Sequence, residues 1–201
     1  MTRRHRTLVA LATAAALFAP VLASAQDLHP SRRKSPLGWA RTTVGDAYVS
    51  LVYGRPYKRD RDNIFGTKES GAVVPYGEIW RTGANEATEI TVTKDVTIAG
   101  QKLAAGTYSL HTTPGAEVWK FHFNSLLGLD GTGYFDRAAQ KFTPAELPPH
   151  DVLVVEAKSS ALPKEKEVDQ MTFEFEKTAT GADLVFRWIT TEVRLPIAAA
   201  K

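Results

Sequence analysis

The sequence predicts an all-β protein, a single antiparallel β-sandwich of jelly-roll-like form, and three observations point to this class. Many short runs alternate apolar with polar side chains, as half-buried strands do. Glycine, proline and asparagine mark turns between these runs. No stretch of useful length repeats its apolar residues at helical spacing. Short strands at near-regular spacing are typical of a sandwich or a barrel, and one-sided alternation favours antiparallel sheets with one face in water.

Alternation defines the strands of the first half of the chain. Residues 48–53 alternate until Gly54-Arg55-Pro56 ends the strand. Residues 88–98 place their branched side chains at even spacing, and residues 103–113 return after a turn that contains a glycine. We therefore expect these two segments to form neighbouring antiparallel strands.

The second half continues in the same way. Residues 118–124 follow a Pro-Gly turn and alternate aromatic with polar residues, and residues 151–157 are rich in valine. In residues 171–175 one methionine and two phenylalanines alternate with polar side chains, which indicates a half-buried strand. A Thr-Gly turn leads into residues 184–189, and residues 193–197 are expected to form a last edge strand.

Two longer loops interrupt the strands. Residues 58–70 are highly charged, and we expect the apolar pair Ile64 and Phe65 to hold this loop against the core. Residues 125–150 contain three glycines and a Pro-Pro pair, and long loops on rigid β scaffolds often carry function. Within this loop, residues 135–141 are the best candidate for a short helix.

The start of the chain predicts export from the cytoplasm. A positive start, an apolar run over residues 8–18 and the small residues Ala23-Ser24-Ala25 form the pattern of a secretory signal peptide over residues 1–25, cleaved after Ala25. Residues 26–36 then form a polar, flexible leader, and residues 37–198 form the sandwich domain. The expected location is the periplasm or the medium.

Composition excludes several functional classes. The chain has 25 Lys+Arg against 22 Asp+Glu, and the excess lies in the three arginines of the expected signal peptide, so the remainder has no formal net charge. We therefore expect no nucleic-acid binding, which normally requires a basic face. No cysteine is present, so there are no disulfides and no thiol nucleophile. No later apolar run is long enough to predict a transmembrane segment.

Residues 74–88 form the most unusual run of the chain. Trp80, Arg81, Asn85 and Glu86 lie among small residues that suit tight turns. The planar guanidinium of Arg81 is suited to bind a carboxylate or phosphate. The alternative is that Arg81 forms an ion pair with Glu86, stacks on Trp80 and closes a loop without any ligand.

Several elements together resemble one family of exported bacterial proteins. They are Tyr53-Gly54-Arg55-Pro56, Ile64-Phe65-Gly66, residues 74–88, Leu103-Ala104-Ala105-Gly106-Thr107-Tyr108, Phe123-Asn124 and Leu184-Val185-Phe186-Arg187-Trp188. The chain is similar over about residues 35–197 to the domain of unknown function DUF2911. This resemblance implies no reaction, cofactor or catalytic residue.

The histidines suggest a weaker, metal-based alternative. If the turn after residue 113 closes a hairpin, His111 falls opposite His122, where two imidazoles could share a metal with a third ligand such as Glu86 or His150. The alternative is that both histidines lie on a solvated face. Ser109 is close to His111 in the sequence, but no orienting carboxylate is evident, and no Gly-x-Ser-x-Gly motif is present.

We therefore expect a non-enzymatic binding or envelope-associated module without a cofactor. Its partner would be an unknown small molecule, carbohydrate or small anion, or an envelope component. The candidate ligand-binding residues are Arg55, Trp80, Arg81, Asn85, Glu86 and His111. One alternative is a metal-assisted hydrolase that uses Glu86 with His111 and His122, and another is a purely structural or protein-interaction domain.

Overall fold

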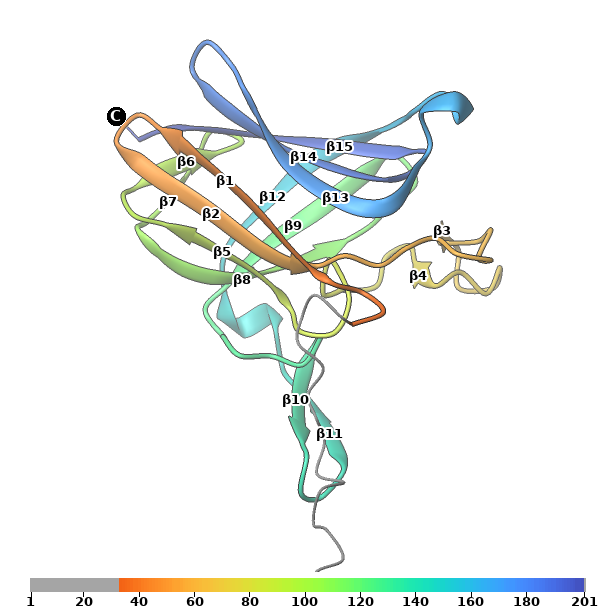
Figure 1. Cartoon of the computed structure of the whole chain (residues 1–201). Helices are drawn as coiled ribbons and strands as arrows, with labels where there is room; N and C mark the ends of the chain where they lie inside the picture. Colours follow the sequence, from red (N-terminus) through yellow and green to blue (C-terminus); the bar gives the residue numbers. More distant parts are fainter. Residues whose placement is uncertain (1–32, 201) are drawn as a thin grey trace, which may run out of the picture.

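Extended segments with alternating burial make up most of the chain, which confirms the all-β prediction (Figure 1). The structure is a computed structural model that describes residues 33–200. The expected signal peptide and most of the expected leader lie outside these described residues. The strands are β1 (Leu37–Val44), β2 (Ala47–Gly54), β3 (Phe65–Gly66), β4 (Val74–Pro75), β5 (Thr88–Val92), β6 (Val96–Ile98), β7 (Gln101–Leu103), β8 (Gly106–Thr113), β9 (Val118–Asn124), β10 (Gly133–Asp136), β11 (Lys141–Pro144), β12 (Asp151–Ala161), β13 (Val168–Lys177), β14 (Gly181–Ile189) and β15 (Thr191–Ala199).

The main sheet folds over itself into two layers. Strands β1, β2, β5, β8, β9 and β12 lie side by side in that order, and β15, β14 and β13 continue the sheet beyond β12. Figure 1 shows β13, β14 and β15 lying above the layer that contains β1, β2, β5 and β8. The short hairpin of β6 and β7 adds to β15. All neighbours in this sheet are antiparallel, so the sandwich is built largely as a meander.

Strand β12 carries the sheet from one layer into the other. Its first part, from Asp151 to Lys158, pairs with β9, and its last three residues pair with β15. Strands that change sheets in this way form the corners of a sandwich. The two layers are therefore covalently continuous along this side.

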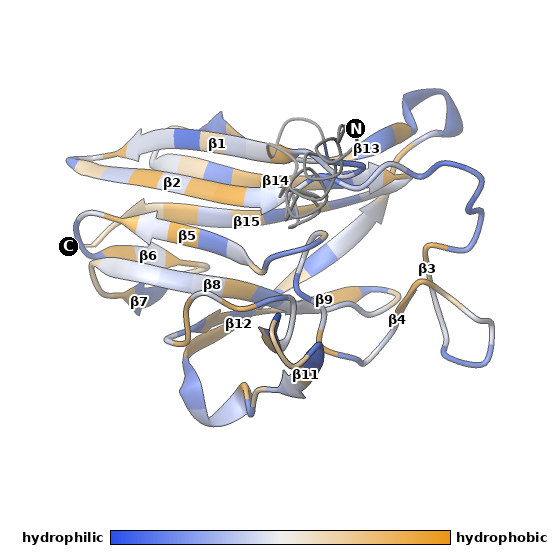
Figure 2. Ribbon diagram, turned by 60° about the horizontal axis from the view of Figure 1, so that its bottom comes forward, coloured by the Kyte–Doolittle hydropathy of each residue, from blue (hydrophilic) through white to orange (hydrophobic). Residues whose placement is uncertain are grey.

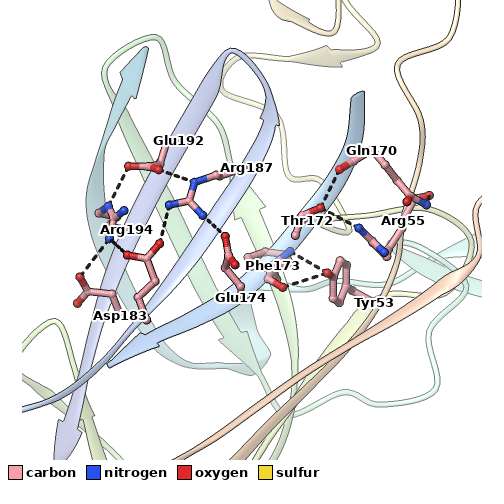
Figure 3. Close-up of polar contacts among 11 residues, drawn as sticks. Tyr53, Arg55, Gln170, Thr172, Phe173, Glu174, Asp183, Arg187, Glu192 and Arg194 are labelled. Atoms are coloured by element: carbon pink, nitrogen blue, oxygen red, sulfur yellow. Dashed lines mark hydrogen bonds and ion pairs between the residues drawn. The ribbon is translucent and has the colours of Figure 1, made fainter. Parts of the chain in front are cut away.

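The opposite side is joined by the end of β2 and the edge of β13 (Figure 3). The Tyr53 hydroxyl accepts a hydrogen bond from the Phe173 N–H at 2.8 Å and donates one to the Phe173 carbonyl at 3.1 Å. Arg55 donates to the Met171 carbonyl at 3.1 Å and to the Thr172 hydroxyl at 2.8 Å. Burial raises the pKa of Tyr53, so this hydroxyl keeps the proton that it donates. These bonds satisfy backbone groups that an edge strand would otherwise leave unpaired.

Apolar side chains fill the space between the layers. Figure 2 shows the alternation of apolar and polar residues along β2, whose inward residues Val49 and Leu51 are fully buried. Phe173 and Met171 are buried on β13, as the alternation of residues 171–175 predicts. Ile64 is buried in the same core and Phe65 packs against it, which confirms that this pair holds the charged loop.

Residues 135–141 are not helical, so this part of the sequence prediction is wrong. Strands β10 and β11 form a hairpin that projects from the sandwich (Figure 1). The Asp136 carboxylate accepts hydrogen bonds from the N–H groups of Ala138 and Ala139, both at 2.9 Å. An aspartate that bonds to the backbone two residues on favours a turn over a helix, and Gln140 has a positive φ of 50° that ends the turn.

An ion-pair network covers the outer face of β13, β14 and β15 (Figure 3). Arg187 pairs with Glu174, Glu176 and Glu192, and Arg194 pairs with Glu176 and Glu192. Because each of these charges has partners on the neighbouring strands, we assign this face to stability rather than to ligand binding. Among the described residues, no helix is long and apolar enough to cross a membrane.

We predict that Tyr53→Phe destabilises the fold by about 1–3 kcal/mol, because two buried backbone groups of Phe173 lose their partner. Urea denaturation with and without the substitution measures this difference. Tyr48→Phe is the matched control, because the Tyr48 side chain is exposed and its hydroxyl makes no hydrogen bond within the described chain. Equal stabilities of wild type and Tyr53→Phe would contradict the role of this hydroxyl.

Candidate ligand-binding site

Trp80 extends the main sheet just before β5 begins. Its N–H donates to the Thr112 carbonyl at 2.7 Å, and the Thr112 N–H donates back to the Trp80 carbonyl at 2.9 Å. The indole then packs among the core aromatics, stacked on Trp188 at 6.1 Å and edge-on to Phe65 at 5.9 Å. This packing fixes the backbone from which Arg81 extends.

Thr82 turns the chain sharply after Arg81. Its φ of 55° is unusual for a β-branched residue, and Thr82 is fully buried. Its hydroxyl donates to the Thr112 hydroxyl at 3.0 Å, and its carbonyl accepts from the Thr88 hydroxyl at 2.7 Å. A strained residue that is held by hydrogen bonds on both sides is a feature that clusters at ligand sites.

The turn is also held by a close approach of two backbones. A Cβ added to Gly54 would lie 1.9 Å from the Ala84 carbonyl oxygen, and one added to Gly83 would lie 2.9 Å from the Gly54 carbonyl oxygen. Only glycine allows this contact. The run around Gly54 at the end of β2 is therefore packed directly on the run that carries Arg81.

Arg81 is a half-buried cation without a partner among residues 33–200. No carboxylate lies within ion-pair distance of it among the described residues, and its Nε atom is buried without a hydrogen-bond acceptor there. Burial lowers the pKa of Arg81, although an arginine remains charged. A buried donor that has no acceptor is uncommon and indicates that an acceptor is supplied from elsewhere.

A cavity of about 730 Å³ opens beside this guanidinium. Its walls include Trp80, Trp188 and Thr132, which are joined by three more basic residues, Lys34, Arg59 and Arg61. Two acidic residues, Asp60 and Glu78, also line the cavity. The Glu78 carboxylate already forms an ion pair at 2.8 Å with Lys68, which lies outside the cavity lining.

The two other arginines of the cavity already donate hydrogen bonds within the protein. Arg59 donates to the Lys34 carbonyl at 2.9 Å. Arg61 donates to the backbone carbonyls of Lys58 and Tyr57 and lies over the Trp188 ring at 5.8 Å. Arg81 is therefore the arginine of this cavity with the most unused hydrogen-bonding capacity.

The sequence-predicted site residues do not all meet at this cavity. Trp80 and Arg81 line it, whereas Arg55 binds β13 and Asn85 donates to the Ser35 carbonyl at 3.2 Å. Glu86 forms an ion pair with Arg33, so the expected pairing of Arg81 with Glu86 is wrong. A separate cavity of about 280 Å³ is lined by Glu86 together with Glu89 and Asp130.

His111 lies opposite His122 in the β8–β9 register, as the hairpin predicts. The expectation that both histidines lie on a solvated face is wrong, because the loop after β9 covers it and His111 is fully buried. The His111 Nε2 atom lies 3.2 Å from the Gly131 carbonyl and Nδ1 lies 3.5 Å from the Ser109 hydroxyl. Among residues 33–200, no three His, Cys, Asp or Glu side chains are grouped closely enough to hold a metal ion.

His111 supports the site indirectly. Its imidazole is hydrogen-bonded to the Gly131 carbonyl. Gly131 in turn lies so close to Arg81 that an added Cβ would be 2.7 Å from an Arg81 Nη atom. The loop held by His111 thus lies directly against the guanidinium.

Sequence reasoning missed a polar network on the same face of β8 and β9. His122 lies between the Thr113 hydroxyl and the Asp151 carboxylate, and Asn124 binds the same carboxylate. The link between His122 and Asp151 depends on the pairing of β9 with β12 across a long loop, which no local pattern reveals.

Comparison with known families identifies the family of the chain. A sequence model of the family described as "Protein of unknown function (DUF2911)" matches residues 35–197. The chain belongs to the DUF2911 family. This match confirms the resemblance on which the sequence analysis relied, and in this DUF2911 protein the Gly54 and Arg81 runs that carried the resemblance lie against each other. No curated protein and no solved structure matches the chain.

We predict that His111 makes this DUF2911 protein sensitive to acid. Burial lowers the pKa of His111 below its ordinary value of 6.5, and the nearby His122 lowers it further, while the Gly131 carbonyl and Asp151 oppose the shift. The stabilisation is complete above pH 6.5 and is lost as the pH falls from there through the lowered pKa, because the unfolded chain then binds a proton that the folded chain does not.

Urea denaturation at pH 7.5 and pH 5 tests this linkage. Wild type should lose more stability than His111→Gln between these pH values, and His150→Gln, which alters an exposed histidine, should behave as wild type. The same loss in all three proteins would contradict the assignment.

Proposed function

We propose that this protein is a binding module for a small anionic ligand, which its cavity holds through Arg81. The observation that carries the proposal is the buried Nε atom of Arg81, which has no acceptor among the described residues. A carboxylate or phosphate would satisfy that donor and neutralise the guanidinium with two parallel hydrogen bonds.

The size and lining of the cavity support a small molecule. A volume of about 730 Å³ is within the range of ligand pockets. Trp80, which is only partly buried, offers aromatic surface on which the planar or apolar part of a ligand can pack. Acidic sugars combine such an apolar ring face with a carboxylate, so they fit both the carbohydrate and the anion expectations.

The proposed module works outside the cytoplasm. Its support is the signal-peptide pattern of residues 1–25. A cleaved protein that begins at Gln26 and is recovered from the periplasm or medium would agree with this placement, whereas an uncleaved cytoplasmic protein would contradict it.

We predict that Arg81→Met leaves the melting temperature unchanged or raises it, because the substitution removes a desolvated charge that has no partner in the described part of the chain. Calorimetric titration with D-glucuronate and with inorganic pyrophosphate at constant ionic strength should detect binding to wild type and at least a tenfold loss in Arg81→Met. Arg41→Met is the matched control, because Arg41 is exposed on β1 and does not line the cavity.

Two results would contradict the proposal. One is a sharp fall in the melting temperature of Arg81→Met, which would give Arg81 a structural role. The other is anion binding of equal strength in wild type and Arg81→Met, which would place the anion elsewhere.

A further inference from the structure

A second group of polar side chains, outside the cavity beside Arg81, is connected by a series of hydrogen bonds. The Thr113 hydroxyl lies 3.0 Å from the His122 Nε2 atom, and the His122 Nδ1 atom lies 2.8 Å from Asp151. The other oxygen of Asp151 accepts a hydrogen bond from the Asn124 amide at 2.8 Å. Thr113 lies at the end of β8, His122 and Asn124 lie on β9, and Asp151 begins β12.

The chemistry of the series fixes the direction of each bond. An ionised carboxylate only accepts hydrogen bonds, so the proton of a neutral His122 lies on Nδ1 and faces Asp151. The Nε2 atom is then an acceptor, and the Thr113 hydroxyl donates to it. A hydroxyl, an imidazole and a carboxylate connected through these atoms form the arrangement that activates nucleophiles in acyl-transfer enzymes.

Burial holds this arrangement in place. The side chains of His122 and Asp151 are only 12% and 9% exposed, and the amide of Asn124 is tied to the Leu147 carbonyl at 2.7 Å. Thr113 is partly buried, like His122 and Asp151, and is followed by a short loop. The N–H groups of Gly115 and Ala116 in this loop have no acceptor among the described residues, so they remain available to a ligand.

We propose that Thr113 is a nucleophile that His122 and Asp151 activate toward small carboxylic esters. The Thr113 oxygen bonds to the ester carbonyl carbon while its proton moves to His122 Nε2, and the leaving alcohol takes that proton as the carbon–oxygen bond breaks. Water then attacks the threonyl ester and gives a proton to His122, which returns it to the Thr113 oxygen. The products are one alcohol and one carboxylic acid, and His122 acts as base and then as acid in each half. This activity is independent of anion binding at Arg81.

Covalent labelling of the full chain tests the proposal. The folded protein is treated with p-nitrophenyl acetate or with an alkyl fluorophosphonate, and digested peptides are analysed by mass spectrometry. We expect Thr113 to be labelled at least tenfold faster than any other hydroxyl, and His122→Gln to slow this labelling by about a hundredfold or more. Thr113→Val should abolish release of p-nitrophenol, and Thr107→Val should not, because Thr107 contacts another threonine and no histidine.

The wild-type labelling pattern decides the question even if a variant folds poorly. Selective modification of Thr113 in the wild type, lost in urea, supports the proposal. No adduct on Thr113, or labelling at the same rate in a folded His122→Gln protein, would overturn it and leave the series as a structural link between β8, β9 and β12.

Discussion

The hydrogen bonds between Tyr53 and the backbone of Phe173 join the two layers on the side where the chain does not connect them. They fix the end of β2, and with it the position of Gly54. Because Gly54 has no side chain, the Ala84 carbonyl lies directly against it, and this contact holds the turn after Arg81 in place. The direction of the Arg81 side chain thus depends on how the sandwich is closed.

Two unfavourable features lie side by side at this point. Thr82 adopts a backbone conformation that is unfavourable for β-branched residues, and Arg81 has a buried donor without an acceptor in the part of the chain that the structure describes. Each costs stability, and the buried donor of Arg81 is not needed to close the turn, which Thr82 makes and the Trp80–Thr112 bonds anchor. Natural proteins retain such costs where activity requires them, so the pair indicates a site under functional constraint.

Local patterns predicted much of the fold. Period-two alternation revealed the strands around Phe173 and Phe121, and a short turn was enough to place His111 opposite His122. The hairpin at residues 133–144 was missed because its turn depends on the carboxylate of Asp136, which bonds the backbone only once the chain has bent.

Long-range contacts could not be predicted. Glu86 pairs with Arg33 rather than with Arg81, which is nearer in the sequence. A long loop buries His111 on a face of the sheet that the alternation of apolar and polar residues assigned to solvent. Of the six candidate ligand-binding residues, Trp80 and Arg81 alone line the larger cavity. The contact of Thr113, His122 and Asp151 requires three strands in register, which sequence spacing does not reveal.

The most direct measurement is the Nε–H resonance of Arg81 in a proton–nitrogen correlation spectrum, assigned through Arg81→Lys. We predict a resonance that shifts and saturates as pyrophosphate or D-glucuronate is added, while that of Arg41 stays in place. An Arg81 resonance that does not move at saturating concentrations of either anion would contradict a cavity built to hold an anionic group.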